Sequence, residues 1–262
     1  MKIVMIGSSF RPGGNTEQIL DLLQDALRKE AEAQRLDLEI DRLSLSREAV
    51  QPCRGCRLCF DRGEEFCPNR DGVLSLQKKL ESADAVVAAS PVYVEDVNGI
   101  MKTWIDRMAF NCHRPAFCGK CAAVLTTSGN GSSGHAASTL ANALGAWGFR
   151  VVARGKFRMG AQMEPEQAAA SFQARLDRIA SKLLKAIFRQ PEQSPSLSSL
   201  IAFRIQQATF RRSAPRTKDR LFWEERGWLG KGAVCFSGKR PGAAKVLFAG
   251  LIGFVVRKLI LT

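Results

Sequence analysis

The sequence lacks the residue patterns that identify many classes of enzyme directly. Its two histidines, His113 and His135, belong to no recognisable nucleophile or metal-binding pattern, and no carboxylate pair or Ser/His arrangement stands out. The loop after the first apolar segment is neither a Walker A loop nor the G-x-G-x-x-G dinucleotide fingerprint. These absences fit an enzyme in which a bound cofactor performs the reaction.

Long apolar segments are also missing. The run at residues 246–256 contains eleven apolar residues, whereas a membrane-spanning helix needs about twenty. The first residues, MKIVMIGSSF, lack the apolar core and the cleavage site of a signal peptide. We therefore expect a cytoplasmic protein, in which clustered cysteines indicate metal or redox chemistry rather than stable disulfides.

Cysteine and positive charge are what the sequence has in excess, with eight cysteines and a net charge of +14. Residues 190–262 carry 13 Lys and Arg but 4 Asp and Glu, so +9 of the net charge belongs to this segment. The stretch PEQSPSLSS, residues 191–199, is typical of a linker. We expect a main domain over residues 1–189, followed by a linker and a basic, partly apolar extension over residues 190–262.

The extension mixes basic with aromatic residues, a composition found in surfaces that bind nucleic acid, anionic membranes or partner subunits. No nucleic-acid motif accompanies it, so we expect no nucleic-acid partner. For the apolar run at residues 246–256, two alternatives stay open. The run is either buried against a second subunit or docked peripherally at the inner face of the membrane.

Apolar segments of strand length alternate with segments of helical period. The five predicted strands lie at residues 2–9, 36–45, 85–91, 120–128 and 149–157. A helical pattern follows each strand, the last of them at residues 164–190. This alternation predicts a doubly wound α/β sheet with right-handed crossovers. In such a sheet, ligands bind beyond the carboxyl ends of the strands.

The loop after the first predicted strand, GSSFRPGGNT, supplies hydroxyls, amides and a guanidinium just before a helix. Backbone N–H groups at a helix start favour a phosphate, and Arg11 adds a positive charge. The alternative is a plain turn in which Asn15 or Thr16 caps the helix. The loop after the fourth predicted strand, TTSGNGSSGH, offers further donors at Thr127, Ser128, Gly129 and Asn130.

Two motifs together resemble a known family. The pattern GSSxRxxGNT, followed by SPVY and then by a lysine and DR, is similar to the NADPH-dependent FMN reductase family over residues 1–189. The resemblance implies a flavodoxin-like, five-stranded parallel sheet of order 2-1-3-4-5. It also implies that the FMN phosphate binds at Ser8, Arg11, Asn15 and Thr16, and that the isoalloxazine ring lies along Pro91, Val92 and Tyr93. The donors of the fourth-strand loop, at Thr127, Ser128, Gly129 and Asn130, would then face the polar edge of the flavin.

Tyr93 is the only tyrosine of the chain, and a flat aromatic face suits stacking on a flavin. The alternative is that Tyr93 packs against its own helix. Lys102, Asp106 and Arg107 match the family's lysine and DR, but we interpret them as helix-face and interface residues. Because neighbouring residues of a helix do not face each other, we expect Asp106 and Arg107 to pair elsewhere.

Half of the cysteines lie in one insertion, residues 52–70, with the spacing C-x2-C-x2-C-x7-C. These thiols belong to Cys53, Cys56, Cys59 and Cys67. Two successive x2 spacings suit ferredoxin-type ligation of an iron–sulfur cluster, and Gly55 and Gly63 allow the chain to wrap. Tetrahedral zinc and free thiols are the alternatives. We interpret another pair, Cys118 and Cys121, as small buried hydrophobic residues.

The spacing also resembles the iron-sulfur flavoproteins, a branch of the same family in which a compact cysteine motif holds a 4Fe-4S cluster close to FMN. The sequence departs from that branch at CPNRDG, where Asp71 stands alone and the family commonly has two aspartates.

The resemblance implies an FMN-dependent oxidoreductase that takes electrons from NAD(P)H or a reduced carrier and passes them to a small acceptor through a 4Fe-4S relay. A cluster-free NAD(P)H-dependent reductase of flavin or quinones is one alternative. A non-catalytic electron-transfer flavoprotein is another. The partners expected are a small-molecule or protein electron donor and acceptor, and the resemblance implies a homo-oligomer.

Overall fold

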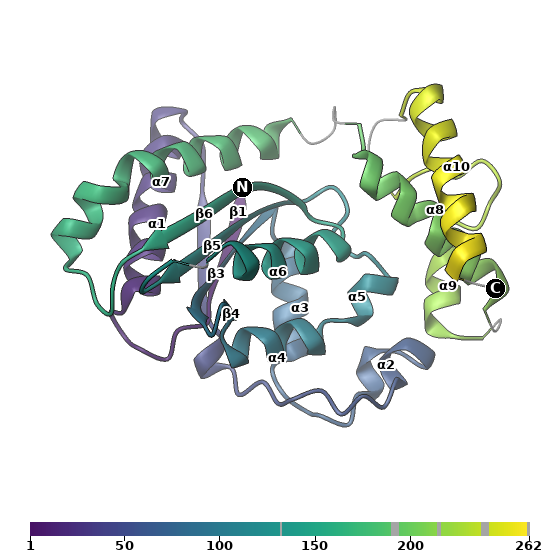
Figure 1. The fold of residues 1–262 in the computed structure, drawn as a ribbon, viewed down its shortest axis with the longest axis horizontal. Coiled ribbons are helices and arrows are strands. Elements are labelled where there is room, and N and C mark those ends of the chain that lie inside the picture. The colour runs from purple at the N-terminus through teal and green to yellow at the C-terminus, as the bar shows by residue number, and fades with distance from the viewer. Residues whose placement is uncertain (132, 190–193, 214–215, 237–240, 261–262) are drawn as a thin grey trace.

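The computed structural model describes residues 1–131, 133–189, 194–213, 216–236 and 241–260. The chain up to residue 189 forms a three-layer unit, in which helices cover both faces of a central sheet (Figure 1). The described residues after it form a group of helices at one end of that unit (Figure 1).

Five parallel strands build the sheet in the order β2-β1-β3-β5-β6. Their bounds are β1 (Lys2–Gly7), β2 (Glu39–Ser44), β3 (Ala85–Tyr93), β5 (Cys121–Ser128) and β6 (Arg150–Arg158). The predicted order 2-1-3-4-5 is confirmed. A two-residue strand, β4 (Asp96–Val97), is an addition that pairs antiparallel with the end of β3.

Helices cover the two faces of the sheet unequally. One face carries α1 (Asn15–Ala33) and α7 (Pro165–Phe188), and the other carries α3 (Val73–Ser82), α4 (Gly99–Arg107) and α6 (Ser133–Ala146) (Figure 1). Because the side chains of a strand alternate between its two faces, Ile3 and Met5 join one core cluster and Val4 and Ile6 join the other. Burial on both faces explains the continuous apolar runs in the sequence.

The extension has a small core of its own. Its helices are α8 (Leu197–Arg212), α9 (Lys218–Glu225) and α10 (Ala243–Ile260). The rings of Phe203, Phe210, Trp223 and Trp228 are buried together, and Cys118 of the main unit packs against them. Aromatic residues that the sequence offered as candidates for partner contacts therefore pack mainly on one another.

The end of the predicted linker, residues 191–199, is helical. Residues 191–193 lie outside the described ranges, and residues 197–199 already belong to α8. The side chain of Ser196 caps this helix by accepting a hydrogen bond from the backbone N–H of Ser199 at 3.1 Å. Serine in this segment therefore starts a helix, as N-cap serines commonly do. Within the described part of the chain, no helix is both long and apolar enough to cross a membrane.

The turn after α6 requires glycine at position 148. Gly148 has φ +107°, and its N–H and that of Phe149 close the helix by bonding to Gly145 O at 3.1 Å and to Leu144 O at 3.0 Å. This is the pattern of a Schellman motif. A Cβ at this position would meet the N and Sγ atoms of Cys118 at 2.8 Å each.

We expect Gly148→Ala to lower the free energy of unfolding by at least about 2 kcal/mol, because it combines left-handed strain with a backbone clash. Gly145→Ala is the matched control, since a Cβ there meets nothing within 4 Å and lies within α6. The control should raise stability by about 0.5 kcal/mol. Urea unfolding followed by circular dichroism measures both, and equal stabilities would contradict the prediction.

Candidate functional site

A cavity of about 200 Å³ opens beyond the carboxyl ends of β1, β3 and β5. Three loops that are far apart in the sequence line it together with Gly160 and Ala161. The predicted FMN residues that line it are Arg11, Asn15, Thr16, Pro91, Val92, Tyr93, Thr127, Ser128 and Gly129. The edge of the sheet at which ligands were expected therefore holds a single cavity built from the predicted residues.

Ser8 and Asn130, the other two predicted residues, do not line this cavity. Ser8 is fully buried, and its Oγ donates to Ala89 O at 3.4 Å while its carbonyl accepts from Asn98 Nδ2 at 2.6 Å. It braces the end of β1 against β3 and the start of α4. Asn130 is exposed in the loop that follows β5.

The start of α1 faces this cavity without a side-chain cap. Gly14 is the N-cap, and the first bond of the helix runs from Gln18 N to Gly14 O at 3.1 Å. The alternative of a capping Asn15 or Thr16 is wrong. Asn15 instead donates to Gly160 O at 3.1 Å, and the Thr16 hydroxyl lies 2.6 Å from that of Thr127. The first backbone N–H groups of α1 precede its hydrogen-bond ladder, as a phosphate site requires.

Tyr93 stands at the mouth of the cavity and is half-exposed. Val94 and Glu95, which follow it, have φ values of 49° and 67° and join β3 to β4 as a two-residue hairpin loop. Positive φ at both positions is the mark of a type I′ turn, and it is strained at a β-branched residue such as Val94.

Asn98 is a buried polar residue that the sequence analysis missed. Its Oδ1 accepts from Met101 N at 3.3 Å and so caps α4, and its Nδ2 holds the carbonyl of Ser8. The signal in the sequence was the asparagine before GIMK, a common N-cap residue. Through Asn98, the beginning of α4 is fixed to the first loop of the cavity.

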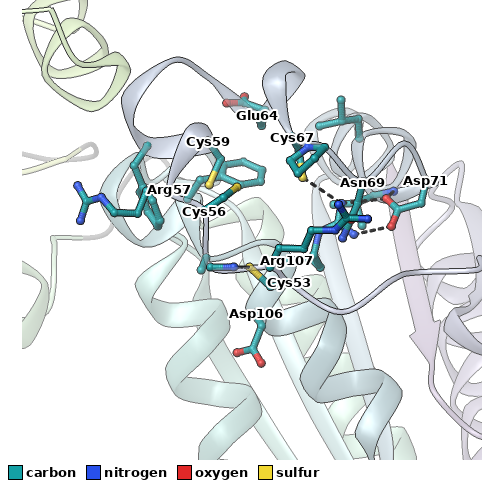
Figure 2. A pocket seen from close by; sticks show the side chains of 18 of the residues that line it. Cys53, Cys56, Arg57, Cys59, Glu64, Cys67, Asn69, Asp71, Asp106 and Arg107 are labelled. Carbon is teal, nitrogen blue, oxygen red and sulfur yellow. Dashed lines mark hydrogen bonds and ion pairs between the residues drawn. The ribbon is translucent and has the colours of Figure 1, made fainter.

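The cysteine insertion forms a second cavity, of about 280 Å³, at the other end of α4. All four predicted ligands, Cys53, Cys56, Cys59 and Cys67, line it. Its remaining walls come from α2 (Leu58–Asp61), the start of α3 and the end of α4. Figure 2 shows the sulfur of Cys67 turned toward Arg107, with Asp71 on the far side of that guanidinium.

The backbone of this insertion wraps as the glycines predicted. Gly55 and Gly63 have φ values of +65° and +129°, and Arg57 also adopts the left-handed conformation. The N–H of Gly55 donates to the Sγ of Cys53 at 3.4 Å. Burial raises the pKa of the Cys59 thiol to about 11, against the opposing charge of Arg114.

No group of three or more His, Cys, Asp or Glu side chains in the described ranges is placed to share one metal ion. The four thiols line a common cavity but do not converge on a single point. Soft thiolates are the ligands that zinc and iron–sulfur clusters prefer. The donor set therefore suits such a centre, and the metal site itself stays a prediction.

A buried ion pair fastens the exit of the insertion to α4. Arg107 binds Asp71 through both terminal nitrogens of its guanidinium, and Nη2 lies 3.0 Å from Oδ1. The side chains of Arg107 and Asp71 are 4% and 3% exposed. Arg107 Nη1 also donates to Gln51 O at 2.9 Å, and Nη2 lies 3.6 Å from Cys67 Sγ. Lys102 and Asp106 pair with each other at 2.6 Å on the exposed face. The expectation that Asp106 and Arg107 pair elsewhere is confirmed.

The same contacts account for the altered exit CPNRDG. Asp71 fills the partner position of Arg107, and it also accepts from the backbone N–H groups of Gln51 and Val73. A Cβ at Gly72 would lie 3.2 Å from the carbonyl oxygen of Glu48 and 3.2 Å from its carboxylate. A second aspartate would therefore be crowded and would face a like charge at this position.

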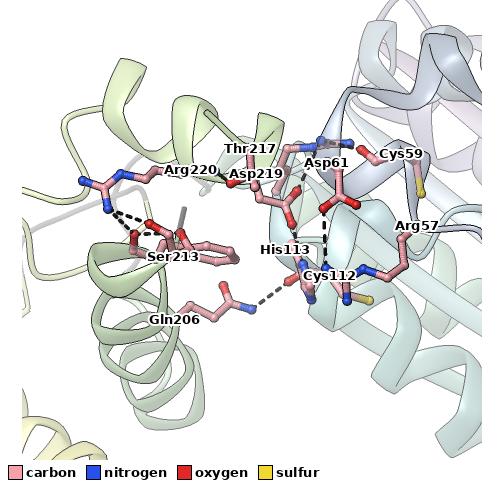
Figure 3. Close-up of polar contacts among 12 residues, drawn as sticks. Arg57, Cys59, Asp61, Cys112, His113, Gln206, Ser213, Thr217, Asp219 and Arg220 are labelled. Carbon is pink, nitrogen blue, oxygen red and sulfur yellow. Dashed lines mark hydrogen bonds and ion pairs between the residues drawn. The ribbon is translucent and has the colours of Figure 1, made fainter. Parts of the chain in front are cut away.

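A second buried arginine ties the insertion to the extension. Arg114 donates to Cys59 O at 2.8 Å and to Glu64 Oε2 at 2.7 Å. Its Nη1 also lies 3.3 Å from Asp219 Oδ1 of α9, without the angle of a hydrogen bond. The other oxygen of Asp219 is 2.6 Å from His113 Nδ1 (Figure 3). His113 therefore has a partner that its sequence pattern did not reveal.

Comparison with known proteins agrees with this architecture. The family model for NADPH-dependent FMN reductase matches residues 1–164. An iron-sulfur flavoprotein of Archaeoglobus fulgidus is 30% identical over 231 residues, which span 87% of this chain and 100% of that protein. An iron-sulfur flavoprotein of Methanocaldococcus jannaschii is 36% identical over 107 residues, 41% of this chain and 51% of that protein.

Two solved structures share the fold. RosB with bound 8-demethyl-8-formylriboflavin-5'-phosphate has a TM-score of 0.59 at 16% identity, with 82% of this chain and 88% of that chain covered. An oxidoreductase from Corynebacterium diphtheriae has a TM-score of 0.54 at 20% identity, with 74% and 98% covered. At these identities the likeness concerns the fold alone.

Because the Arg107–Asp71 pair is buried, replacing Asp71 should destabilise the fold more than replacing the exposed Asp106. We expect Asp71→Asn to lower the free energy of unfolding by about 3 kcal/mol at neutral pH, because it leaves Arg107 buried without its counter-charge. Asp106→Asn, which alters an exposed pair, should cost less than about 0.5 kcal/mol. Denaturant unfolding measures the stability of both variants. A similar loss of stability in both would contradict the prediction.

The pH dependence of this contrast follows from the pKa of Asp71. Burial alone would raise this pKa, but the hydrogen bonds and charge of Arg107 and two backbone N–H donors lower it overall. A carboxyl with a lowered pKa stabilises the fold above its unfolded-state value and loses this contribution as the pH falls toward its folded-state pKa. The difference in the free energy of unfolding between the wild type and Asp71→Asn should therefore become smaller below about pH 4.

Proposed function

This chain belongs to the NADPH-dependent FMN reductase family, and from this premise we propose that it binds FMN in the cavity beyond β1, β3 and β5 and reduces a small acceptor with electrons from NAD(P)H or a reduced carrier. Membership of the family makes the chain an oxidoreductase. One observation supports the site more than any other. Three loops predicted separately to touch FMN line one cavity at the expected edge of the sheet.

The residues of this cavity suit the parts of FMN in turn. The open N–H groups at the start of α1 and the guanidinium of Arg11 would hold the phosphate. Asn15 is not available to cap the helix, because both ends of its amide bind the backbone at Gly160 and Met163. These bonds hold the segment around Gly160, which also lines the cavity, against the phosphate loop.

The flavin ring would lie along Pro91 and Val92, with the half-exposed face of Tyr93 beside it. The buried hydroxyls of Thr127 and Ser128 would meet its polar edge. When bound, FMN would exchange electrons in pairs with a hydride donor or singly with a metal cluster. The chain supplies position, hydrogen bonds and the exclusion of water from one side of the ring.

We further propose that Cys53, Cys56, Cys59 and Cys67 hold a 4Fe-4S cluster. In such a cluster each thiolate binds a different iron, so ligands that line a cavity without converging suit it better than they suit a single zinc ion. The arginines at positions 54, 57, 70 and 107 line the same cavity and would offset the negative charge of four thiolates. Binding would release the proton that burial favours on Cys59.

The iron–sulfur cluster, the oligomeric state and the identity of the electron donor and acceptor are all proposals for this chain. The name of the Archaeoglobus fulgidus relative supports an iron–sulfur flavoprotein, and its alignment, which spans 87% of this chain, must extend past residue 189. A homo-oligomer with a small-molecule or protein electron donor and acceptor is proposed on the resemblance alone, and a cytoplasmic location stays a prediction.

FMN binding is tested at Arg11. We expect Arg11→Ala to weaken FMN binding about tenfold, because it removes a charge-assisted contact with the phosphate at a partly solvated position. Arg28→Ala is the matched control, since Arg28 is exposed on α1 away from the cavity. Titration of the apoprotein, followed by quenching of FMN fluorescence, measures both dissociation constants.

An unchanged constant for Arg11→Ala would contradict the phosphate site. The FMN-loaded wild type should also oxidise NAD(P)H with free flavin or a quinone as acceptor. Loaded protein that oxidises neither nicotinamide but accepts electrons from a reduced carrier would instead support the electron-transfer flavoprotein.

The cluster is tested at Cys56. Protein purified anaerobically should contain about four irons and four acid-labile sulfides per chain, and Cys56→Ala should lose most of both. Cys112→Ala is the matched control, because Cys112 does not line the cysteine cavity. FMN content should stay the same in both variants. Zinc in place of iron, or neither metal in protein that retains FMN, would overturn the cluster proposal and leave the flavin proposal standing.

A further inference from the structure

The last helix of the extension exposes an apolar stripe. Leu247, Phe248, Leu251, Phe254 and Val255 of α10 are between 46% and 77% exposed. Their spacing, i, i+1, i+4, i+7 and i+8, places them on one side of the helix. They make up five of the eleven large hydrophobic side chains that are exposed in the described part of the chain. We call these five residues the α10 stripe.

The other side of α10 is occupied by α8 (Figure 1). Ala249 is buried there, and a Cβ at Gly253 would come within 3.0 Å of Cβ of Arg204, a residue of α8. Small residues allow the two helices to approach closely on this side. The α10 stripe is thus not the face that packs on α8, and its side chains remain 46% to 77% exposed.

Positive charge flanks this exposed face in the sequence. Residues 226–262 contain seven Lys and Arg and no Asp or Glu. Lys245 precedes the stripe along α10, and Arg257 and Lys258 follow it, so the apolar segment is bounded by cations at both ends. A partner for this face must therefore offer an apolar layer together with negative charge.

We propose that the α10 stripe docks on the surface of an anionic lipid bilayer, with α10 lying in the interfacial plane. An amphipathic helix with apolar residues on one side and lysine and arginine around it binds in this way. One observation favours lipid over a second copy of the chain, because a second copy brings the same seven cations and no acidic residue from this segment. No helix in the described ranges is long and apolar enough to cross a membrane, so α10 would lie at the surface.

The placement of α10 leaves the two cavities free. α10 lies on the outer side of the extension, with α8 between it and the sheet (Figure 1). The cavity proposed for FMN is instead lined by the start of α1 and the ends of β3 and β5. Docking would therefore bring the reductase to a membrane surface without covering the entrance for a donor or acceptor. The proposal rests on this surface alone and does not need bound FMN or a cluster.

The full-length protein should sediment with vesicles of phosphatidylcholine containing phosphatidylglycerol and should stay in solution with vesicles of phosphatidylcholine alone. Raising the salt concentration from about 0.1 M to about 0.5 M should weaken this binding, because screening removes the lipid–cation attraction. The double variant Phe248→Ser/Leu251→Ser should lose at least about tenfold in vesicle affinity, because it removes two large apolar side chains from the stripe.

The matched control is Phe188→Ser/Leu221→Ser, which removes one phenylalanine and one leucine that are 53% and 40% exposed on α7 and α9. This control should bind vesicles as the wild type does, and the circular dichroism of both variants should show intact helices. Absence of binding to phosphatidylglycerol vesicles would overturn the proposal. So would equal binding by the two variants, or a wild-type dimer that the α10 variant alone dissociates.

Discussion

The buried ion pair between Arg107 and Asp71 is the contact on which the arrangement of the cysteine site depends. Neither the short helix α2 nor the helical turn at Glu64–Phe66 contains a buried residue, so the insertion cannot be held by apolar packing alone. A bidentate pair inside the fold fixes direction as well as distance, but it is stable only when both charges are satisfied. Here the guanidinium also meets Gln51 O and Cys67 Sγ, so the pair reaches the beginning and the end of the insertion.

A second buried arginine, Arg114, anchors the other side of the insertion in the same way. It holds the carbonyl of Cys59 and the carboxylate of Glu64, and it lies beside Asp219 from the extension. Trp223 completes the junction by donating from its indole to His113 O at 2.8 Å. The extension is thus more than a tail, because its aromatic core supports the aspartate that faces His113 and Arg114.

The sequence predicted what local patterns can encode. Strand order, the cavity at the carboxyl edge and the glycines of the cysteine loop follow from apolar periodicity, turn chemistry and motif spacing, and nine of the eleven predicted FMN residues line that cavity. The partners of Arg107 and His113 could not be predicted, because they lie 36 and 106 residues away and no periodicity relates them. The role of Asn15 could not be predicted either, because an asparagine at the start of a helix can cap that helix or, as here, bond to a distant carbonyl such as that of Gly160.

One short helix sets the relation between the two cavities. Asn98 at the beginning of α4 is bonded to the first loop of the cavity beyond β1, β3 and β5, and Arg107 at its end is bonded to the cysteine insertion. A helix of nine residues is about 13 Å long, and that length separates the two anchoring points. Because α4 buries Met101 and Trp104 in the core, it cannot slide without breaking that packing. The spacing of the two cavities is therefore a property of the rigid core rather than of the loops that line them.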